Sequence, residues 1–270
     1  MKKASVVVLA GQSNAVGVGF VKCLPYHFSE EKIDKLQNGH KNVMINYNSH
    51  DKESGGFCPV TFGCSEVAKY TLGPEVGIAE NLSLRYPEHE IFIVKCAFGG
   101  ADLHSEWISP SARNENTKTP NCGKPVGWCY DALIKIMNES LEYLEGQGYT
   151  PEIKGFCWMQ GESDADTIEH VTEYESLYDT MLSDFNTAFG KYINGCVYVD
   201  AGISDIWNCY KEMNSLKLNY SKKADNRRYF DTLAHGLTTR NEPREDPDIY
   251  HYDSDSILKL GELFGAHIDL

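Results

Sequence analysis

Short apolar runs alternate along the chain with longer segments in which apolar residues recur every three to four positions. The short runs lack polar alternation and are rich in Val, Ile and Phe, which is typical of strands buried on both faces of a parallel sheet. They predict strands at Ser5–Ala10, Val43–Tyr47, Ile91–Ala97, Ile153–Met159 and Cys196–Ala201. The periodic segments predict helices at Pro74–Tyr86, Asp131–Glu145, Thr167–Phe189 and Ser254–His267. This alternation predicts an α/β fold with helices on both faces of a parallel sheet.

Polar stretches between these elements predict loops at Phe20–Lys41, His104–Val126 and Asn219–Tyr250. The middle stretch is rich in Pro and Asn, and it is a candidate lid or cleft rim. No repeat or low-complexity segment divides the 270 residues. We therefore expect residues 1–270 to form a single domain.

Charge and cysteine usage narrow the choice of partners and compartment. The chain has 25 Lys and Arg against 39 Asp and Glu, and this net charge of −14 disfavours nucleic acid and acidic membrane surfaces. No apolar run approaches the roughly 20 residues that span a bilayer. The nine Cys lack Cys-x-x-Cys spacing, which predicts free thiols in a reducing compartment. Since no clear signal-peptide cleavage site follows the first apolar run, we expect a cytoplasmic protein, or a secreted one whose leader was trimmed.

The end of the first predicted strand holds the first candidate for chemistry. Ligands of parallel sheets bind at the carboxyl ends of the strands, where Gly11-Gln12-Ser13-Asn14 stands. Ser13 on such a turn is a candidate nucleophile, and an ordinary turn or capping serine is the alternative. The segment is not the Gly-x-Ser-x-Gly elbow of α/β-hydrolases, because Ala15 occupies the second glycine position.

Two later strand ends offer donors and acids. Gly99 and Gly100 follow the third predicted strand, where a glycine turns a backbone N–H towards an oxyanion or simply makes a tight turn. The string Trp-Met-Gln-Gly-Glu-Ser-Asp at residues 158–164 covers the end of the fourth strand. Its amide and carboxylates suit a donor, an orienting group or an acid, and a polar loop that caps the next helix is the alternative.

Asp248 and His251 precede the last predicted helix. At this spacing the carboxylate can bond one ring nitrogen within a turn and fix the tautomer of a general base. The alternative is a loop histidine beside an incidental acid. Asp231 and His235 form a competing pair, whose more apolar setting indicates a structural role.

Metal and nucleotide binding have no local signature in this chain. It lacks His-x-x-x-His, His-Glu-x-x-His and any calcium-type Asp/Asn loop. It also lacks Gly-x-x-x-x-Gly-Lys-Ser/Thr and Gly-x-Gly-x-x-Gly. We expect no metal ion and no cofactor, and a metal-dependent hydrolase is the alternative that a chelator would reveal.

Together the strand ends supply a nucleophile, a base, an orienting acid and N–H donors, which are the parts of an acyl-transfer site. The chain resembles the SGNH (GDSL-like) hydrolase superfamily. Within it the chain is similar to the sialate O-acetylesterase-like group and to the related carbohydrate esterase family six of acetylxylan esterases. The matching pieces are Gly11-Gln12-Ser13-Asn14, Gly73-Pro74-Glu75, Gly99-Gly100, Trp158–Asp164, Asp248-x-x-His251 and Asp253–Ser256.

The resemblance implies a three-layer α/β/α sandwich with a five-stranded parallel sheet of the flavodoxin-like SGNH type. It implies that Ser13 is the nucleophile, that His251 is the general base and that Asp248 orients this base. The reaction would remove O-acetyl groups from a small-molecule or oligosaccharide ester through an acetyl-enzyme, without a cofactor.

The same resemblance assigns three oxyanion donors. They are the N–H of Ser13, the N–H of Gly100 with Gly99 as the competing assignment, and the amide of Gln160 in place of the Asn of other SGNH enzymes. Support for the site is implied for five residues: Gln12, Asn14, Glu75, Gly99 and Glu162.

The implied substrate is acetylated xylan or oligosaccharide, or O-acetylated sialic acid. The acidic surface favours a neutral sugar over a carboxylated one. Trp107 and Trp128 flank the polar middle loop, and they either stack on sugar rings or pack in the interior. The alternatives are a short-chain carboxylesterase for non-sugar esters and a carbohydrate-binding protein of the same fold without turnover.

Overall fold

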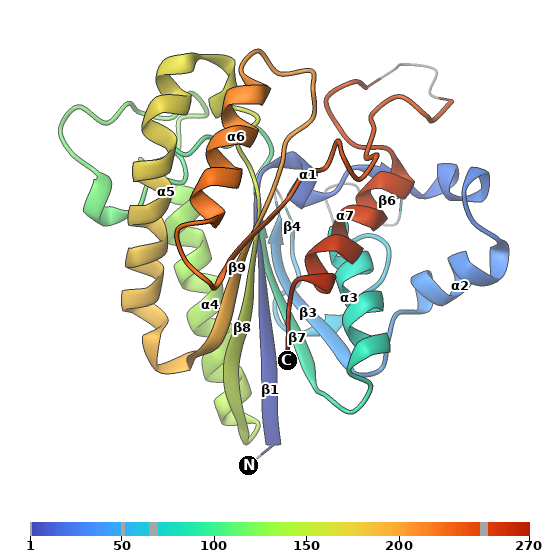
Figure 1. Cartoon of the computed structure of the whole chain (residues 1–270). Coiled ribbons are helices and arrows are strands. Elements are labelled where there is room, and N and C mark those ends of the chain that lie inside the picture. The colour runs from blue at the N-terminus through green and yellow to red at the C-terminus, as the bar shows by residue number, and fades with distance from the viewer. Residues whose placement is uncertain (1, 50–51, 65–69, 244–247) are drawn as a thin grey trace.

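The computed structural model describes residues 2–49, 52–64, 70–243 and 248–270, and it is built around one large sheet (Figure 1). Within these residues the sheet has eight strands in the order β10-β9-β8-β1-β7-β3-β4, with β5 also paired to β3. Their bounds are β1 Lys2–Gly11, β3 Val43–Ser49, β4 Lys52–Glu53, β5 Cys58–Pro59, β7 Ile91–Ala97, β8 Tyr149–Met159, β9 Ile193–Ala201 and β10 Arg227–Phe230. A separate antiparallel pair joins β2 (Gly19–Phe20) to β6 (Thr71–Leu72).

The five predicted strands are the central ones, β3, β7, β1, β8 and β9, and they are parallel to one another. The predicted total of five is wrong, because β10 adds a further parallel strand and both β4 and β5 pair antiparallel with β3. These additions are only two to four residues long. In β10 only Phe230 is buried, so the strand has no buried apolar run from which it could be predicted.

Helices lie on both faces of the sheet (Figure 1). One side carries α4 (Trp128–Gly146), α5 (Ile168–Phe189) and α6 (Tyr210–Ser221), and the other carries α3 (Pro74–Arg85) and α7 (Ser254–Ala266). The four predicted helices are confirmed as α3, α4, α5 and α7. Helices α3 and α7 touch through glycine, since a Cβ on Gly77 would stand 2.1 Å from the carbonyl oxygen of Leu258.

Besides the single turn α1 (Ser13–Val16), two helices were missed because the faces that they bury carry few apolar residues. α2 (Glu30–Asn38) lies within the predicted loop Phe20–Lys41 and buries only Leu36, so it shows no apolar stripe. α6 buries Asn214 and Lys217 beside its apolar residues. Together with β10, these elements correct two of the three loop predictions. The third loop, His104–Val126, contains only the short turn η3 (Pro110–Ala112).

The cysteines behave as the sequence predicts, and the helices show no membrane span. All nine cysteines are free, and Cys96, Cys157 and Cys196 are buried among apolar neighbours. In the described part of the chain no helix has both the length and the apolar character needed to cross a bilayer.

The carboxyl ends of β1, β7 and β8 meet at one edge of the sheet, and the candidate residues follow them. Gly11 ends β1 at a φ of 143°, and a Cβ there would lie 1.9 Å from the carbonyl oxygen of Met159 at the end of β8. The N–H of Phe98, just after β7, donates to the carbonyl of Gly11 at 3.1 Å. Glycine is therefore required at residue 11 for the three strand ends to converge.

Candidate active site

Ser13 begins α1 (Ser13–Val16), a single helical turn directly after β1. The N–H of Gln12 donates to the carbonyl of Met159 at 2.9 Å and fixes this turn to β8. Ser13 is partly exposed, and its own N–H has no acceptor among the described residues, as is usual in the first turn of a helix. The turn thus presents a hydroxyl and a backbone donor at the carboxyl edge of the sheet.

Asp248 and His251 are in direct contact. His251 Nδ1 lies 2.5 Å from Asp248 Oδ2, and the other oxygen of Asp248 accepts the N–H of Tyr250 at 2.9 Å. With its proton on Nδ1, the imidazole keeps the lone pair on Nε2, which is the form that a general base needs. Both side chains are partly exposed, at 25% for His251 and 31% for Asp248.

Asn14 joins the serine turn to the histidine segment. Its Oδ1 accepts the N–H of Tyr252 at 3.0 Å, across 238 residues of sequence. Its Nδ2 donates to Glu162 Oε1 at 2.9 Å. Because Ser13 and His251 directly precede the two bonded residues, this buried amide holds the candidate nucleophile and base in one neighbourhood.

Glu162 is a fully buried carboxyl beneath this bridge. Its Oε1 accepts from Asn14, while its Oε2 has no hydrogen-bond partner among the described residues. Burial raises the pKa of Glu162, against the opposing effects of the Asn14 bond and of the charges of Lys217 and His251. Glu162 therefore contacts the residue that follows Ser13.

Gln160 was expected to donate to an oxyanion, but in the structure its side-chain amide donates to other protein groups. Its amide is fully buried, and Nε2 donates to Gln12 Oε1 at 3.3 Å, to the carbonyl of Ala101 at 3.1 Å and to Asp164 Oδ2 at 2.5 Å. Its Oε1 accepts from the Tyr174 hydroxyl at 2.7 Å. With its two amide hydrogens shared among three protein acceptors, Gln160 positions its neighbours and has no hydrogen left for an oxyanion.

Gly100 lies on an exposed turn after β7, at a φ of 72°. The Ser163 hydroxyl donates to the carbonyl of Gly100 at 2.9 Å and fixes the orientation of that carbonyl. No acceptor for the Gly100 N–H exists within the described residues. This N–H and that of Ser13 are two backbone donors on neighbouring strand ends.

Glu75 does not reach the serine directly. Its Oε2 accepts from Lys95 Nζ at 2.8 Å, and both side chains are fully buried. The same ammonium donates to the carbonyls of Val16 at 2.6 Å and Cys64 at 2.7 Å. Burial raises the pKa of Glu75, and the pairing with Lys95 opposes this effect. Glu75 therefore supports the end of α1 through Lys95, a residue that the sequence hides within a buried strand.

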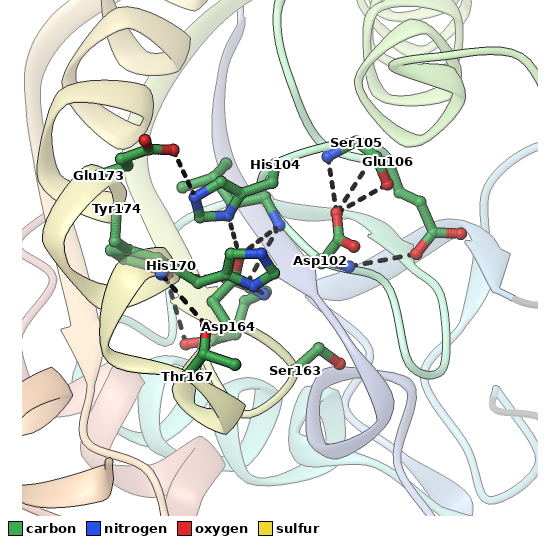
Figure 2. A network of polar contacts seen from close by, with 12 residues as sticks. Asp102, His104, Ser105, Glu106, Ser163, Asp164, Thr167, His170, Glu173 and Tyr174 are labelled. Atoms are coloured by element: carbon green, nitrogen blue, oxygen red, sulfur yellow. Dashed lines mark hydrogen bonds and ion pairs between the residues drawn. The ribbon is translucent and has the colours of Figure 1, made fainter. Parts of the chain in front are cut away.

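Asp164, which accepts from Gln160, forms a second imidazole–carboxylate pair with His104 (Figure 2). His104 Nδ1 is 2.6 Å from Asp164 Oδ1, and the ring of His170 stacks on that of His104 with centroids 4.3 Å apart. No local spacing in the sequence signals this contact, because 60 positions separate His104 from Asp164.

Burial and hydrogen bonding decide two questions that the sequence left open, the role of Trp107 and the role of Asp231. Trp107 is fully buried and packs edge-on against Trp158 at 5.1 Å, so it does not stack on a sugar. Trp128 is partly buried, and its Nε1 donates to Glu106 at 3.3 Å. Asp231 accepts backbone N–H groups two and three residues further on, which gives it the structural turn role expected of that pair.

A mostly parallel α/β sheet with a serine turn, an Asp–His pair and backbone donors at its carboxyl edge is typical of SGNH-type serine hydrolases. The chain belongs to the family described as carbohydrate esterase, sialic acid-specific acetylesterase, whose model matches residues 3–268. The resemblance found in the sequence is therefore confirmed, and the protein is a member of a family of carbohydrate acetylesterases.

Solved structures share the fold at low sequence identity. An Arabidopsis thaliana protein matches with a TM-score of 0.66 and 19% identity, over 99% of this chain and 98% of its own. NanS matches with a TM-score of 0.70 and 18% identity, over 98% of this chain and 97% of its own. A carbohydrate acetylesterase from Xanthomonas citri matches with a TM-score of 0.61 and 11% identity, over 97% of this chain and 55% of its own. The comparison with curated proteins found no match.

Proposed function

We propose that the protein is a serine esterase that removes O-acetyl groups from carbohydrates through an acetyl-enzyme. The observation that carries the proposal is the Asn14 bridge, which holds the Ser13 turn beside the segment with the Asp248–His251 pair. Membership in a family of carbohydrate acetylesterases supports the same chemistry.

In the first half-reaction, His251 Nε2 takes the Ser13 proton as Oγ bonds to the acetyl carbonyl carbon. The oxyanion accepts hydrogen bonds from the N–H groups of Ser13 and Gly100. The bond between the carbonyl carbon and the sugar oxygen then breaks, and the sugar leaves as an alcohol with the proton from His251. Asp248 holds the imidazolium in place and stabilises its charge.

In the second half-reaction, water attacks the acetyl group on Ser13 and gives its proton to His251. The new tetrahedral oxyanion uses the same two N–H donors. Its collapse breaks the bond to Ser13 Oγ, which recovers a proton from His251, and acetate leaves. The sum is one ester and one water converted to one alcohol, one acetate and one proton released to solvent.

The substrate side of the proposal is an acetylated sugar. Acetylated xylan or oligosaccharide and O-acetylated sialic acid are the two classes to compare. The net charge of −14 opposes the approach of a carboxylated sugar, so the proposal favours the neutral class.

The test is hydrolysis of p-nitrophenyl acetate with a chelator present. Ser13→Ala should lower kcat by about 10⁴-fold or more, the size expected when a triad nucleophile is lost. Ser111→Ala is the matched control, because Ser111 is an exposed serine bonded to Asp184 and should retain full activity. An unchanged rate in Ser13→Ala would refute the assignment.

Substrate class is tested with the wild-type protein. Release of acetate from acetylated xylan or from O-acetylated sialic acid, at rates above that for p-nitrophenyl acetate, would support the carbohydrate proposal. Equal rates on acetate and butyrate esters, with no release from either sugar, would favour a short-chain esterase. Sugar binding without any turnover would favour the binding protein.

A further inference from the structure

Lys217 on α6 is a fully buried lysine at the carboxyl edge of the sheet. Its Nζ donates to Asp200 Oδ1 at 2.8 Å, to the carbonyl of Ala201 at 3.0 Å and to the carbonyl of Gln160. The three hydrogens of the ammonium thus meet three acceptors. Asp200 and Ala201 end β9, and Gln160 directly follows the neighbouring strand β8. One side chain therefore ties α6 to the ends of two adjacent strands.

The ion pair between Lys217 and Asp200 is a costly way to stabilise the fold. Burial of two charges has a desolvation cost that their attraction often only balances, and apolar side chains of similar size commonly stabilise as well or better. Burial raises the pKa of Asp200 to about 6, although the charge of Lys217 opposes this shift. The second oxygen of Asp200 is buried without a hydrogen-bond partner among the described residues. The third bond of the lysine, to Gln160, therefore points to a use outside the pair.

The segment 160–163, which begins at that carbonyl, contacts the residues on both sides of the candidate nucleophile. The N–H of Ser163 donates to Gln12 Oε1 at 3.2 Å, just before the nucleophile in the chain. Glu162 Oε1 accepts from Asn14 Nδ2 at 2.9 Å, just after it. The position of the serine turn therefore depends on the position of this segment.

The same segment also contacts the glycine turn and packs directly on the lysine. The Ser163 hydroxyl donates to the carbonyl of Gly100 at 2.9 Å. A Cβ on Gly161 would stand 3.1 Å from Cε and 3.3 Å from Nζ of Lys217, and Gly161 has a φ of 123°, which favours glycine. No side chain therefore separates Lys217 from the backbone turn that leads to Ser163.

We propose that Lys217 is a positioning residue for the esterase reaction, because its bond to the carbonyl of Gln160 holds the segment 160–163 against the turns of Ser13 and Gly100. The inference rests on the proposed function. Lys217 contacts neither the substrate nor the reacting atoms. Loss of its bond lets the segment shift, which displaces the nucleophile and the backbone donors relative to the acetyl carbonyl. Because the transition state depends more steeply on this geometry than binding does, the loss falls on kcat and not on KM.

Two substitutions break the same ion pair and differ at the carbonyl of Gln160. Lys217→Met keeps a side chain of similar length and removes the bond to that carbonyl. Asp200→Asn removes the partner charge and leaves the lysine bonded to the carbonyls of Gln160 and Ala201. In hydrolysis of p-nitrophenyl acetate by the full-length protein, Lys217→Met should lower kcat by about 10–10²-fold, with KM within about threefold of wild type. Asp200→Asn should retain kcat within about threefold.

A double variant separates positioning from stability. Lys217→Met alone leaves the Asp200 carboxylate buried without its partner, so it should unfold at a lower urea concentration than the wild type. Lys217→Met combined with Asp200→Asn removes that unpaired charge and should recover much of the urea midpoint. Its kcat per folded molecule, with the folded fraction taken from circular dichroism, should remain as low as in Lys217→Met.

Kinetic losses that follow the urea midpoints across these variants, or a wild-type kcat in the double variant, would overturn the inference. Ser13→Ala tells the two proposals apart. A large loss in Ser13→Ala with a wild-type kcat in Lys217→Met would leave the esterase assignment standing and refute the positioning role. An unchanged rate in Ser13→Ala would refute both.

Discussion

Two imidazole–carboxylate pairs stand near the same sheet edge and are built differently. Asp248 and His251 come from one turn and are both partly exposed. Asp164 and His104 come from different strand ends, and Asp164 is fully buried. The carboxylate of Asp164 is also shared with Gln160 and with the backbone of Leu103. In the proposed mechanism the first pair exchanges protons with substrate, whereas the second is held within the scaffold.

The largest expected effect separates the two histidines. His251→Gln should lower kcat by about 10⁴-fold, because it removes the base of the triad. His104→Gln should leave kcat within about tenfold of wild type, because in the proposed mechanism no step uses this imidazole. Steady-state hydrolysis of p-nitrophenyl acetate measures both. Equal losses in the two variants would show that His104 also serves the reaction and would remove the distinction.

Substitution of Asp248 should affect catalysis, whereas substitution of Asp164 should affect stability. Asp248→Asn should lower kcat by about 10³–10⁴-fold with little change in the free energy of unfolding. Asp164→Asn should instead cost about 3 kcal/mol of unfolding free energy, since it breaks a buried network of charged hydrogen bonds. Urea denaturation and kinetics on the same samples give both numbers. If Asp248→Asn were destabilised and kept a normal kcat, Asp248 would have a structural role and not the proposed catalytic one.

A smaller loss of activity is expected for Asn14, which links the Ser13 turn to the segment that carries the Asp248–His251 pair. Asn14→Ala should lower kcat by about 10²-fold, because a displacement of roughly 1 Å between nucleophile and base has a cost of that size. Asn46→Ala is the matched control, since Asn46 is also buried but bonds to Ser140 on α4. Similar kinetic losses in both variants would mean that Asn14 acts only through stability.

The smallest effect concerns the buried acid under Asn14. Burial raises the pKa of Glu162 above its ordinary 4.5, so the folded state binds more protons than the unfolded state above that pH. The unfolding free energy of the wild type, relative to Glu162→Gln, should therefore fall as the pH rises through the raised pKa. Urea denaturation from pH 4.5 upward measures this difference. A constant difference would show that the pKa of Glu162 does not change on folding.

The sequence alone was sufficient for the central strands, four helices and the contact between Asp248 and His251. Each of these is local: a buried apolar run, an apolar helical stripe or a carboxylate three residues from an imidazole. Elements without such a local signal were missed. β10 is short and half exposed, and α6 turns Lys217 inward, where it donates to Asp200 at 2.8 Å.

Only the tertiary structure decided the use of each polar group. Gln160 has the right chemistry for an oxyanion donor, and burial among three acceptors assigns its hydrogens elsewhere. Asn14 became the link between Ser13 and His251 only when a loop 238 residues away folded onto it. The cluster of His104 and His170 arises in the same way. The sequence by itself determines which reactive groups are available and which local elements form, because side-chain chemistry and apolar periodicity are properties of short segments. The fold determines which of these groups are buried together, because that depends on contacts between residues far apart in the chain.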